Sequence, residues 1–137
     1  MILPDTSAWI EFDRATGSRV HLRVKELVRA SGSLAVTEPV VMEVLAGARS
    51  DKLEQDLRGL LARCTLLPFD PASDFDGAVR IYRRCRGVGV TPRGLIDCMI
   101  ASVAWRYQAT LLVQDADLER VAGVMGIDVD PASNLRG

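Results

Sequence analysis

The amino-acid sequence predicts an α/β protein, a three-layer α/β/α sandwich with a mostly parallel central sheet. Short apolar runs, typical of buried strands, alternate along the whole chain with longer segments whose apolar residues recur at helical spacing. The connections are short and carry Gly, Pro, Ser or Asp, which favour turns and helix ends. Strands that alternate with helices pair in parallel, because each connecting helix returns across one face of the sheet.

Five short apolar segments are expected as strands, and turn or cap residues end most of them. The first run stops at Asp5, where Thr6 or Ser7 is expected to cap a helix. The third is closed by Pro68, which cannot donate to a strand ladder. In chain order the predicted strands are residues 1–4, 34–36, 65–67, 110–113 and 127–129.

The segments between these strands have apolar residues three or four positions apart and are expected as amphipathic helices. The second carries a start signal, with Thr37 as N-cap, Glu38 in the first turn and Pro39 near the first helical position. After the helix that follows Asp5, the predicted helices cover residues 20–30, 37–48, 51–64, about 70–86, 95–107 and a last segment from 118. In the helix at about residues 70–86 the predicted inward residues are Phe75, Ala78, Val79 and Tyr82, and the predicted outward residues are Arg80, Arg83, Arg84 and Arg86.

The bulk properties of the chain predict one globular domain over residues 1–137. Hydrophobic residues make up 48% and charged residues 26%, which is close to the composition of ordinary globular proteins. A formal net charge of −1 provides no general attraction for polyanions, so any nucleic acid must be held by a local group of basic side chains. No segment is as long and apolar as a membrane span, and no signal sequence is apparent, so a cytoplasmic location is expected.

The cysteine and histidine residues do not indicate a zinc site, a disulfide scaffold or an imidazole-based active site. The three cysteines, Cys64, Cys85 and Cys98, are far apart and lack zinc-ligand spacing, so they are expected as reduced, mainly buried thiols. His21 is the only histidine, which makes imidazole chemistry an improbable basis for catalysis.

Four acidic residues occupy positions where a carboxylate is unusual or functionally placed. Asp5 and Asp115 follow predicted strands, and the carboxyl ends of parallel strands open on one edge of a sheet. Asp97 lies in the first turn of an apolar helix, where simple charge complementarity to the helix dipole is the alternative explanation. Glu43 lies between apolar residues near the edge of a buried helical stripe, where an unpaired carboxylate is costly.

Carboxylates that converge repel one another and therefore require a cation. Ligation by oxygen alone favours Mg²⁺ or Mn²⁺ over zinc, and such an ion can activate water for phosphodiester hydrolysis. Thr6 is expected mainly as a cap and secondarily as a contact for substrate, and Arg93 and Arg84 as contacts to a nucleic-acid backbone.

Three segments also resemble the PIN-domain nucleases, in particular the VapC toxins of bacterial toxin–antitoxin pairs, and the resemblance spans nearly the whole chain. They are ILPDTSAWIE, TEPVVMEVLAGA and RGLIDCMIASVAWRYQATLLVQDADLERVA. The resemblance places the four acids of that family on Asp5, Glu43, Asp97 and Asp115, with Asp117 as an accessory metal ligand and Arg93 at a basic position. Pro4 departs from the usual aliphatic residue and would remove one strand hydrogen bond.

The resemblance implies a Mg²⁺- or Mn²⁺-dependent endoribonuclease that acts as a toxin, forms a homodimer and is inhibited by a VapB-type antitoxin whose C-terminal segment covers the acidic pocket. Two alternatives remain. One is a metal-dependent phosphodiesterase that acts on DNA or small phosphates by the same chemistry, and the other is a catalytically silent PIN module. A receiver-like phosphoacceptor module is a poorer match, because Asp5 has no second acid beside it and no late lysine is present.

Overall fold

The computed structural model describes residues 1–30 and 32–133 and contains the predicted alternation of strands and helices. The helices of this part of the chain are α1 (Thr6–Asp13), α2 (Arg19–Arg29), α3 (Glu38–Ala46), α4 (Asp51–Leu61), α5 (Pro71–Gly87), α6 (Leu95–Tyr107) and α7 (Ala116–Met125). The strands are β1 (Ile2–Pro4), β2 (Ala35–Val36), β3 (Thr65–Leu66) and β4 (Thr110–Leu112). Residues 134–137 of the predicted single domain lie outside the described residues.

All strand pairings are parallel, as the alternating pattern predicted. β1 pairs with β4 and β2 pairs with β3, while a parallel bridge between Ile2 and Leu34 joins the two pairs. A further bridge between Leu111 and Val129 adds the last segment beside β4. The predicted strand at residues 127–129 is therefore reduced to one bridge, and the spatial order is β3, β2, β1, β4 and Val129.

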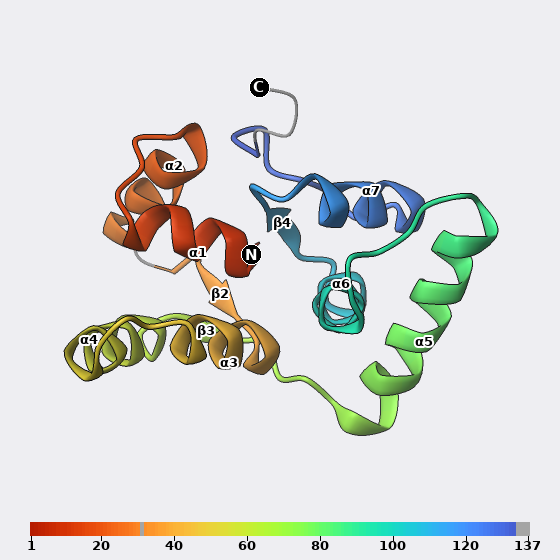
Figure 1. Ribbon diagram of the computed structural model, residues 1–137, viewed down its shortest axis with the longest axis horizontal. Coiled ribbons are helices and arrows are strands. Elements are labelled where there is room, and N and C mark those ends of the chain that lie inside the picture. The colour runs from red at the N-terminus through yellow and green to blue at the C-terminus, as the bar shows by residue number, and fades with distance from the viewer. Residues whose placement is uncertain (31, 134–137) are drawn as a thin grey trace.

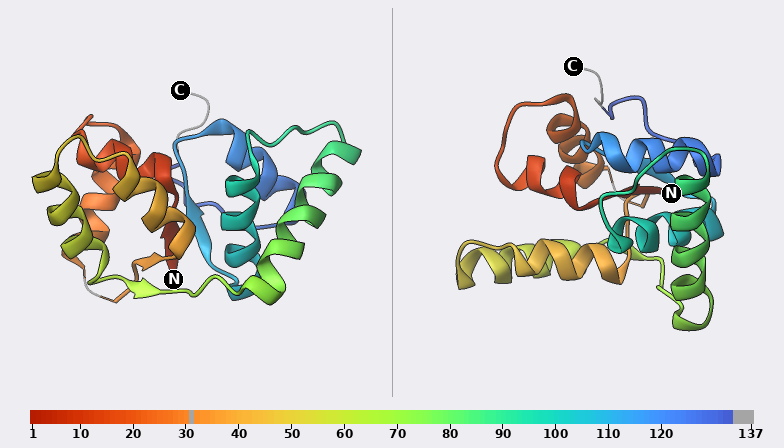
Figure 2. Two further views of the ribbon diagram at one scale, coloured as in Figure 1. Left: turned by 60° about the horizontal axis from the view of Figure 1, so that its bottom comes forward. Right: turned by 45° about the vertical axis from the view of Figure 1, so that its right-hand side comes forward.

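Helices cover both sides of this sheet (Figure 1). On the left of that view β2 lies between α1 and α3, and on the right β4 lies between α7 and α6. α5 stands outside α6, and Figure 2 shows it running alongside that helix. The predicted three-layer α/β/α architecture is confirmed.

Pro4 is buried at the end of β1 and, as predicted, cannot donate a hydrogen bond to the sheet. The Ile2 amide donates to Ser33 O on the β2 side, and the Asp5 amide donates to Leu112 O on the β4 side. Because donors alternate along a parallel strand, the position of Pro4 faces β2, and the Ile2–Leu34 bridge places it opposite Val36 of that strand. β1 and β2 are therefore joined by a single bridge, while the pairing of β1 with β4 extends to Pro4.

The core contains most of the predicted apolar positions, with one error in α5. Phe75 and Val79 were predicted to face inward, but they are 55% and 48% exposed. Ala78, predicted to face inward, is buried, Tyr82 is partly buried, and Ile81 is buried in addition. Gly77 lies so close to Ser102 that an added Cβ would be 2.3 Å from Oγ, which explains why α5 and α6 require a glycine at this contact.

The remaining local predictions hold with small changes in extent. α3 and α4 end two or three residues earlier than predicted, at Ala46 and Leu61. Cys85 and Cys98 are buried and Cys64 is partly buried, all as free thiols. In the described ranges, no helix combines the length and apolar character needed to cross a membrane.

Candidate active site

The site is built at the edge of the sheet where β1 and β4 end. Asp5 follows β1 directly, and its side chain accepts a hydrogen bond from the Ala8 amide at 3.0 Å, so Asp5 is the N-cap of α1. Asp115 follows β4 and caps α7 by accepting from the Asp117 amide at 2.7 Å. Thr6 and Ser7 were predicted as the cap of α1; this was wrong, because the aspartate before them takes that position.

Ser7 instead joins the two strand ends. Its hydroxyl donates to Asp5 Oδ1 at 2.6 Å and accepts from the Gln114 and Asp115 amides at 3.0 and 3.2 Å. One side chain thereby fixes the loop after β4 against the carboxylate after β1. This role of Ser7 was not predicted from the sequence, although the residue lies two positions after an expected site acid.

Glu43 reaches the site from the middle of α3, where it is half-buried as its position on the helix predicted. The Thr6 hydroxyl donates to Glu43 Oε1 at 2.5 Å. Thr6 therefore orients a carboxylate from a different element. Thr37, predicted as the α3 cap, makes no side-chain cap bond.

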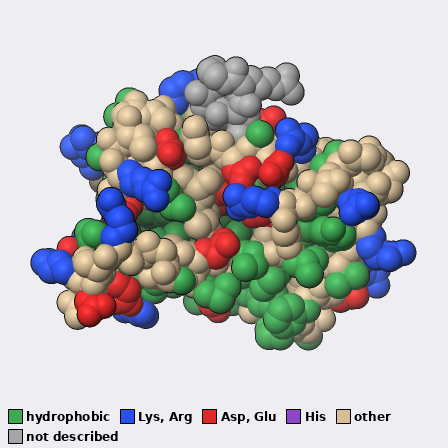
Figure 3. All heavy atoms as spheres, in the orientation of Figure 1, with side chains coloured by type: hydrophobic (Ala, Val, Ile, Leu, Met, Phe, Trp, Pro, Cys, Tyr) green, Lys and Arg blue, Asp and Glu red, His purple; other side chains and the backbone are tan. Residues whose placement is uncertain are grey.

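Asp97 projects from the first turn of α6 and is 4% exposed. Its Oδ1 accepts from Arg93 Nη2 at 3.3 Å, and its Oδ2 is buried without a hydrogen-bond partner. The other end of the Arg93 guanidinium, Nη1, lies 2.6 Å from Asp115 Oδ2. Arg93 thus bridges acids from two elements, and in Figure 3 acidic and basic groups gather over the N-terminal ends of α1 and α6.

Burial and mutual repulsion disfavour negative charge in this group. The pKa of Asp5 is raised to about 7, mainly by burial and to a smaller extent by Asp97 and Asp115, against the hydrogen bonds from Ser7 and Ala8. Burial also raises the pKa of Asp97, with Asp115 and Glu43 adding to the effect and Arg93 opposing it. The protein therefore retains carboxylates that carry their charge at a cost unless a cation is close.

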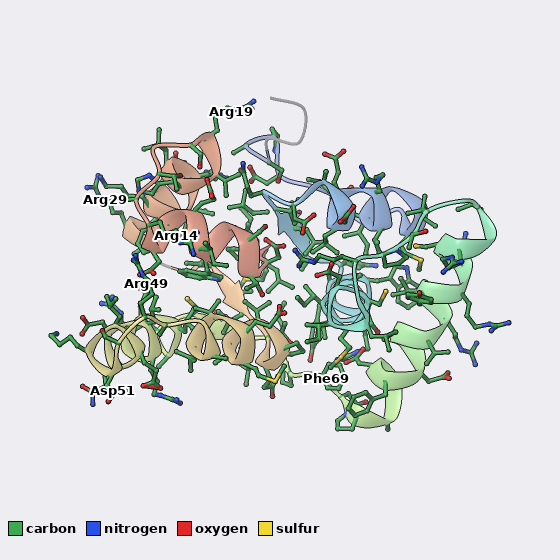
Figure 4. All side chains as sticks on the ribbon, in the orientation of Figure 1. Arg14, Arg19, Arg29, Arg49, Asp51 and Phe69 are labelled. Atoms are coloured by element: carbon green, nitrogen blue, oxygen red, sulfur yellow. The ribbon has the colours of Figure 1, made fainter. Side chains whose placement is uncertain are left out.

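The chemistry of these side chains fits a hard divalent cation, although the acids do not surround one point. Among residues 1–30 and 32–133, no three acidic, His or Cys side chains form a ready-made metal-ligand set. Arg93 lies between Asp97 and Asp115, and the Thr6 hydroxyl holds Glu43. In these contacts the four carboxylates do not meet at one point. The unpartnered Asp97 Oδ2 and the all-oxygen donor set nevertheless match what Mg²⁺ and Mn²⁺ prefer. Oxygen-tipped side chains converge in this region in Figure 4.

Two predicted site residues are placed apart from this acidic cluster, which is defined as Asp5, Glu43, Asp97 and Asp115. The Asp117 carboxylate forms an ion pair with Arg120 on the same helix. Arg84 is exposed on α5, where it lines a hollow of about 380 Å³ with Trp105 and Met125. The structure thus brings Thr6 and Arg93 to the cluster but not Arg84 or the Asp117 side chain.

Comparisons with known proteins agree with this fold. The PIN domain family model matches residues 2–124. A VapC ribonuclease of Mycobacterium bovis and ribonuclease VapC11 of Mycobacterium tuberculosis are each 40% identical over 128 residues, which are 93% of this chain and 96% of either relative.

Similarity in fold extends to a solved complex. A chain of the DNA-bound VapBC structure from Salmonella typhimurium superposes with a TM-score of 0.69 at 21% identity, covering 94% of this chain and 96% of that chain. The family model and the two ribonucleases together cover almost the whole sequence. The chain therefore belongs to the PIN-domain family and, within it, to the VapC ribonucleases.

Proposed function

We propose that this protein is a metal-dependent endoribonuclease that acts as the toxin of a VapBC-type pair and cleaves RNA at the acidic cluster. The observation that carries the proposal is that four carboxylates, from the ends of β1 and β4 and from α3 and α6, lie near enough to repel one another, and that one of them has a buried, unpartnered oxygen. Membership of the VapC ribonucleases supports RNA as the substrate. Because the proposed RNA substrate is present in the cytoplasm, we infer that the enzyme acts there.

Asp5, Glu43, Asp97 and Asp115 would hold the metal, with Mg²⁺ or Mn²⁺ as the proposed ion, and Asp117 is an accessory candidate. The bound ion would supply an activated water and neutralise negative charge on the phosphate. Ser7 and Thr6 position two of the carboxylates, and Thr6 is also a candidate contact for a phosphate oxygen. Burial of Asp5 and Asp97 keeps water from screening the charges.

Arginine side chains are the proposed contacts to the RNA backbone, because a guanidinium can bind phosphate through two hydrogen bonds. Arg93 is the nearest, since it already contacts two acids of the cluster and is 55% exposed. Arg84 is a more distant candidate on α5. A local arrangement of this kind is needed because the chain has a formal net charge of −1.

A VapB-type antitoxin is the proposed protein partner, supported by the VapBC complex among the structures of similar fold. The contacts of Arg93 support a specific mode of inhibition, since they indicate that a guanidinium fits between Asp97 and Asp115. An antitoxin segment that covered the pocket and inserted a basic side chain would satisfy the same carboxylates.

A homodimer is the proposed assembly, and exposed apolar side chains of α3, α5 and β3 support it. They are Met42, Leu66, Phe75 and Val79, which are 48–55% exposed. Figure 3 shows hydrophobic groups gathered at the lower edge of the view, over α3 and α5. Self-association through one patch matches the twofold dimer, which is the commonest protein assembly. Phe75→Ser should yield a monomer in sedimentation velocity; a variant that stays dimeric would place the interface elsewhere.

RNA cleavage by the purified protein in Mg²⁺, Mn²⁺ or EDTA tests the proposal. Asp5→Asn is the informative variant, because the amide oxygen retains the α1 cap while the charge is removed. Asp76→Asn on the exposed face of α5 is the matched control. We expect metal-dependent cleavage that persists in Asp76→Asn and is lost in Asp5→Asn. Cleavage of DNA alone, or none by a protein that binds metal, would contradict the proposal.

A further inference from the structure

Arg93 occupies the position between carboxylates in which a cation is needed. Its guanidinium spans Asp97 Oδ1 at 3.3 Å and Asp115 Oδ2 at 2.6 Å, so it neutralises acids from α6 and from the end of β4. Asp97 is 4% exposed, whereas the Arg93 side chain is 55% exposed. The acids are thus fixed in the fold, while the arginine reaches them from its surface.

The other arginines near this part of the fold are already paired. Arg120 pairs with Asp117, and Arg106 pairs with the buried Asp74 on the opposite side of α6. Arg93 is held only by the two acids of the cluster through the polar contacts of the described residues. When another cation takes its place, the acids keep a counter-charge and the 55% exposed guanidinium returns to water, so the exchange leaves no buried charge uncompensated.

We propose that Arg93 is a built-in counter-ion of the metal-free site, displaced when a divalent cation binds Asp97 and Asp115 and then free to contact a substrate phosphate. The inference rests on the proposed function and deepens it, because it couples metal binding to the release of a substrate contact. A divalent ion between these carboxylates would repel the guanidinium and require the oxygens that it now occupies. The exposed side chain can turn toward solvent without unpacking the core.

Isothermal titration with Mn²⁺ at pH 8 tests the displacement, with no dependence on activity. Arg93→Met keeps the length of the side chain and removes the charge, and Arg80→Met is the matched control at the exposed ion pair with Asp76 on α5. We expect Mn²⁺ to bind Arg93→Met about tenfold more tightly than the wild type, because the competing charge is absent. Arg80→Met should bind it as the wild type does.

A second measurement reports on the arginine itself. In the wild type the Arg93 side-chain NMR signal, identified as the one missing from Arg93→Met, should shift when Mg²⁺ is added. Equal or weaker Mn²⁺ binding by Arg93→Met, or an Arg93 signal indifferent to Mg²⁺, would overturn the displacement while leaving the nuclease proposal intact. Failure of both proteins to bind any divalent ion would overturn the two proposals together.

Discussion

Two buried aspartates on neighbouring helices have the same chemistry and opposite surroundings. Asp74 on α5 is 0% exposed and accepts hydrogen bonds from the Asp70 amide at 2.8 Å, from Ser102 Oγ at 2.7 Å and from Arg106 at 3.2 and 2.6 Å. Asp97 on α6 is 4% exposed, with one contact at 3.3 Å to an exposed arginine and one oxygen unpartnered. Burial alone therefore does not decide what a carboxylate does in this protein.

The two environments shift the pKa values in opposite directions. Burial would raise the pKa of Asp74, but the bonds from Arg106, the Asp70 amide and Ser102 outweigh it and lower the pKa. At Asp97 burial dominates and repulsion from Asp115 and Glu43 adds to it, so the pKa is raised despite Arg93. Asp74 is a structural anion that fastens α5 to α6, whereas Asp97 retains capacity for a further cation.

The largest difference in stability between the two sites is expected when the arginine partner of each aspartate is removed. Arg106→Met leaves a buried carboxylate without its bidentate partner, so the free energy of unfolding should fall by about 3–5 kcal/mol. Arg93→Met should cost less in the metal-free protein, because the raised pKa of Asp97 lets that carboxyl take up a proton when its partner is removed. Urea unfolding in EDTA measures both. Equal losses would mean that the two ion pairs have the same structural role.

The next largest effect is expected in the pH dependence of stability, which should distinguish Asp74 from Asp5, a second acid of the cluster. Burial raises the pKa of Asp5 from an ordinary 3.8 to about 7 in the folded protein, so its stabilising effect is complete below pH 4 and is lost as pH rises through 7. Metal-free protein should therefore lose on the order of 2–3 kcal/mol between pH 5 and 8. Asp74 acts with the opposite sign, losing its contribution only in acid.

Thermal unfolding in EDTA across pH 5–8 measures this slope. Asp5→Asn should flatten it, because the amide does not titrate. Asp76→Asn, an exposed control, should reproduce the wild-type slope. A wild-type protein that gained stability over this interval would contradict the raised pKa of Asp5.

A smaller effect is expected from the hydroxyl that orients Glu43. Thr6→Val removes the 2.5 Å hydrogen bond to Oε1 while keeping the shape of the side chain. A bond to a charged group contributes about 1.5–3 kcal/mol, part of which water can replace here, so RNA cleavage should slow by about tenfold. Thr16→Val removes a similar but solvent-exposed bond to Glu11, away from the cluster, and should leave the rate unchanged. Equal rates for Thr6→Val and the wild type would remove Thr6 from the site.

Much of this site can be predicted from the sequence because the edge of a parallel sheet is a strong constraint. Asp5 and Asp115 follow short buried strands, so the fold class alone brings them together. Glu43 was found because a carboxylate within an apolar helical stripe requires a reason. The contacts of Ser7 and Arg93 could not be foreseen, since they depend on how two loops approach one another.

The errors in the predicted fold also come from contacts that the sequence pattern does not reveal. Phe75 and Val79 were assigned to the core because apolar spacing does not distinguish a face buried in the monomer from one left exposed. Asp74 was overlooked because its partners Ser102 and Arg106 are 28 and 32 positions away in the chain. Long-range pairing of polar groups leaves no periodic pattern in a sequence.

The most direct test of the account is thermal unfolding of Asp97→Asn and Asp74→Asn, each measured in EDTA and in Mg²⁺. In EDTA, Asp97→Asn should be as stable as the wild type or more so, because repulsion is relieved, while Asp74→Asn should be clearly less stable. Mg²⁺ should stabilise the wild type and Asp74→Asn but not Asp97→Asn. Equal stabilisation of all three proteins by Mg²⁺ would contradict the central claim that the acidic cluster binds the catalytic metal.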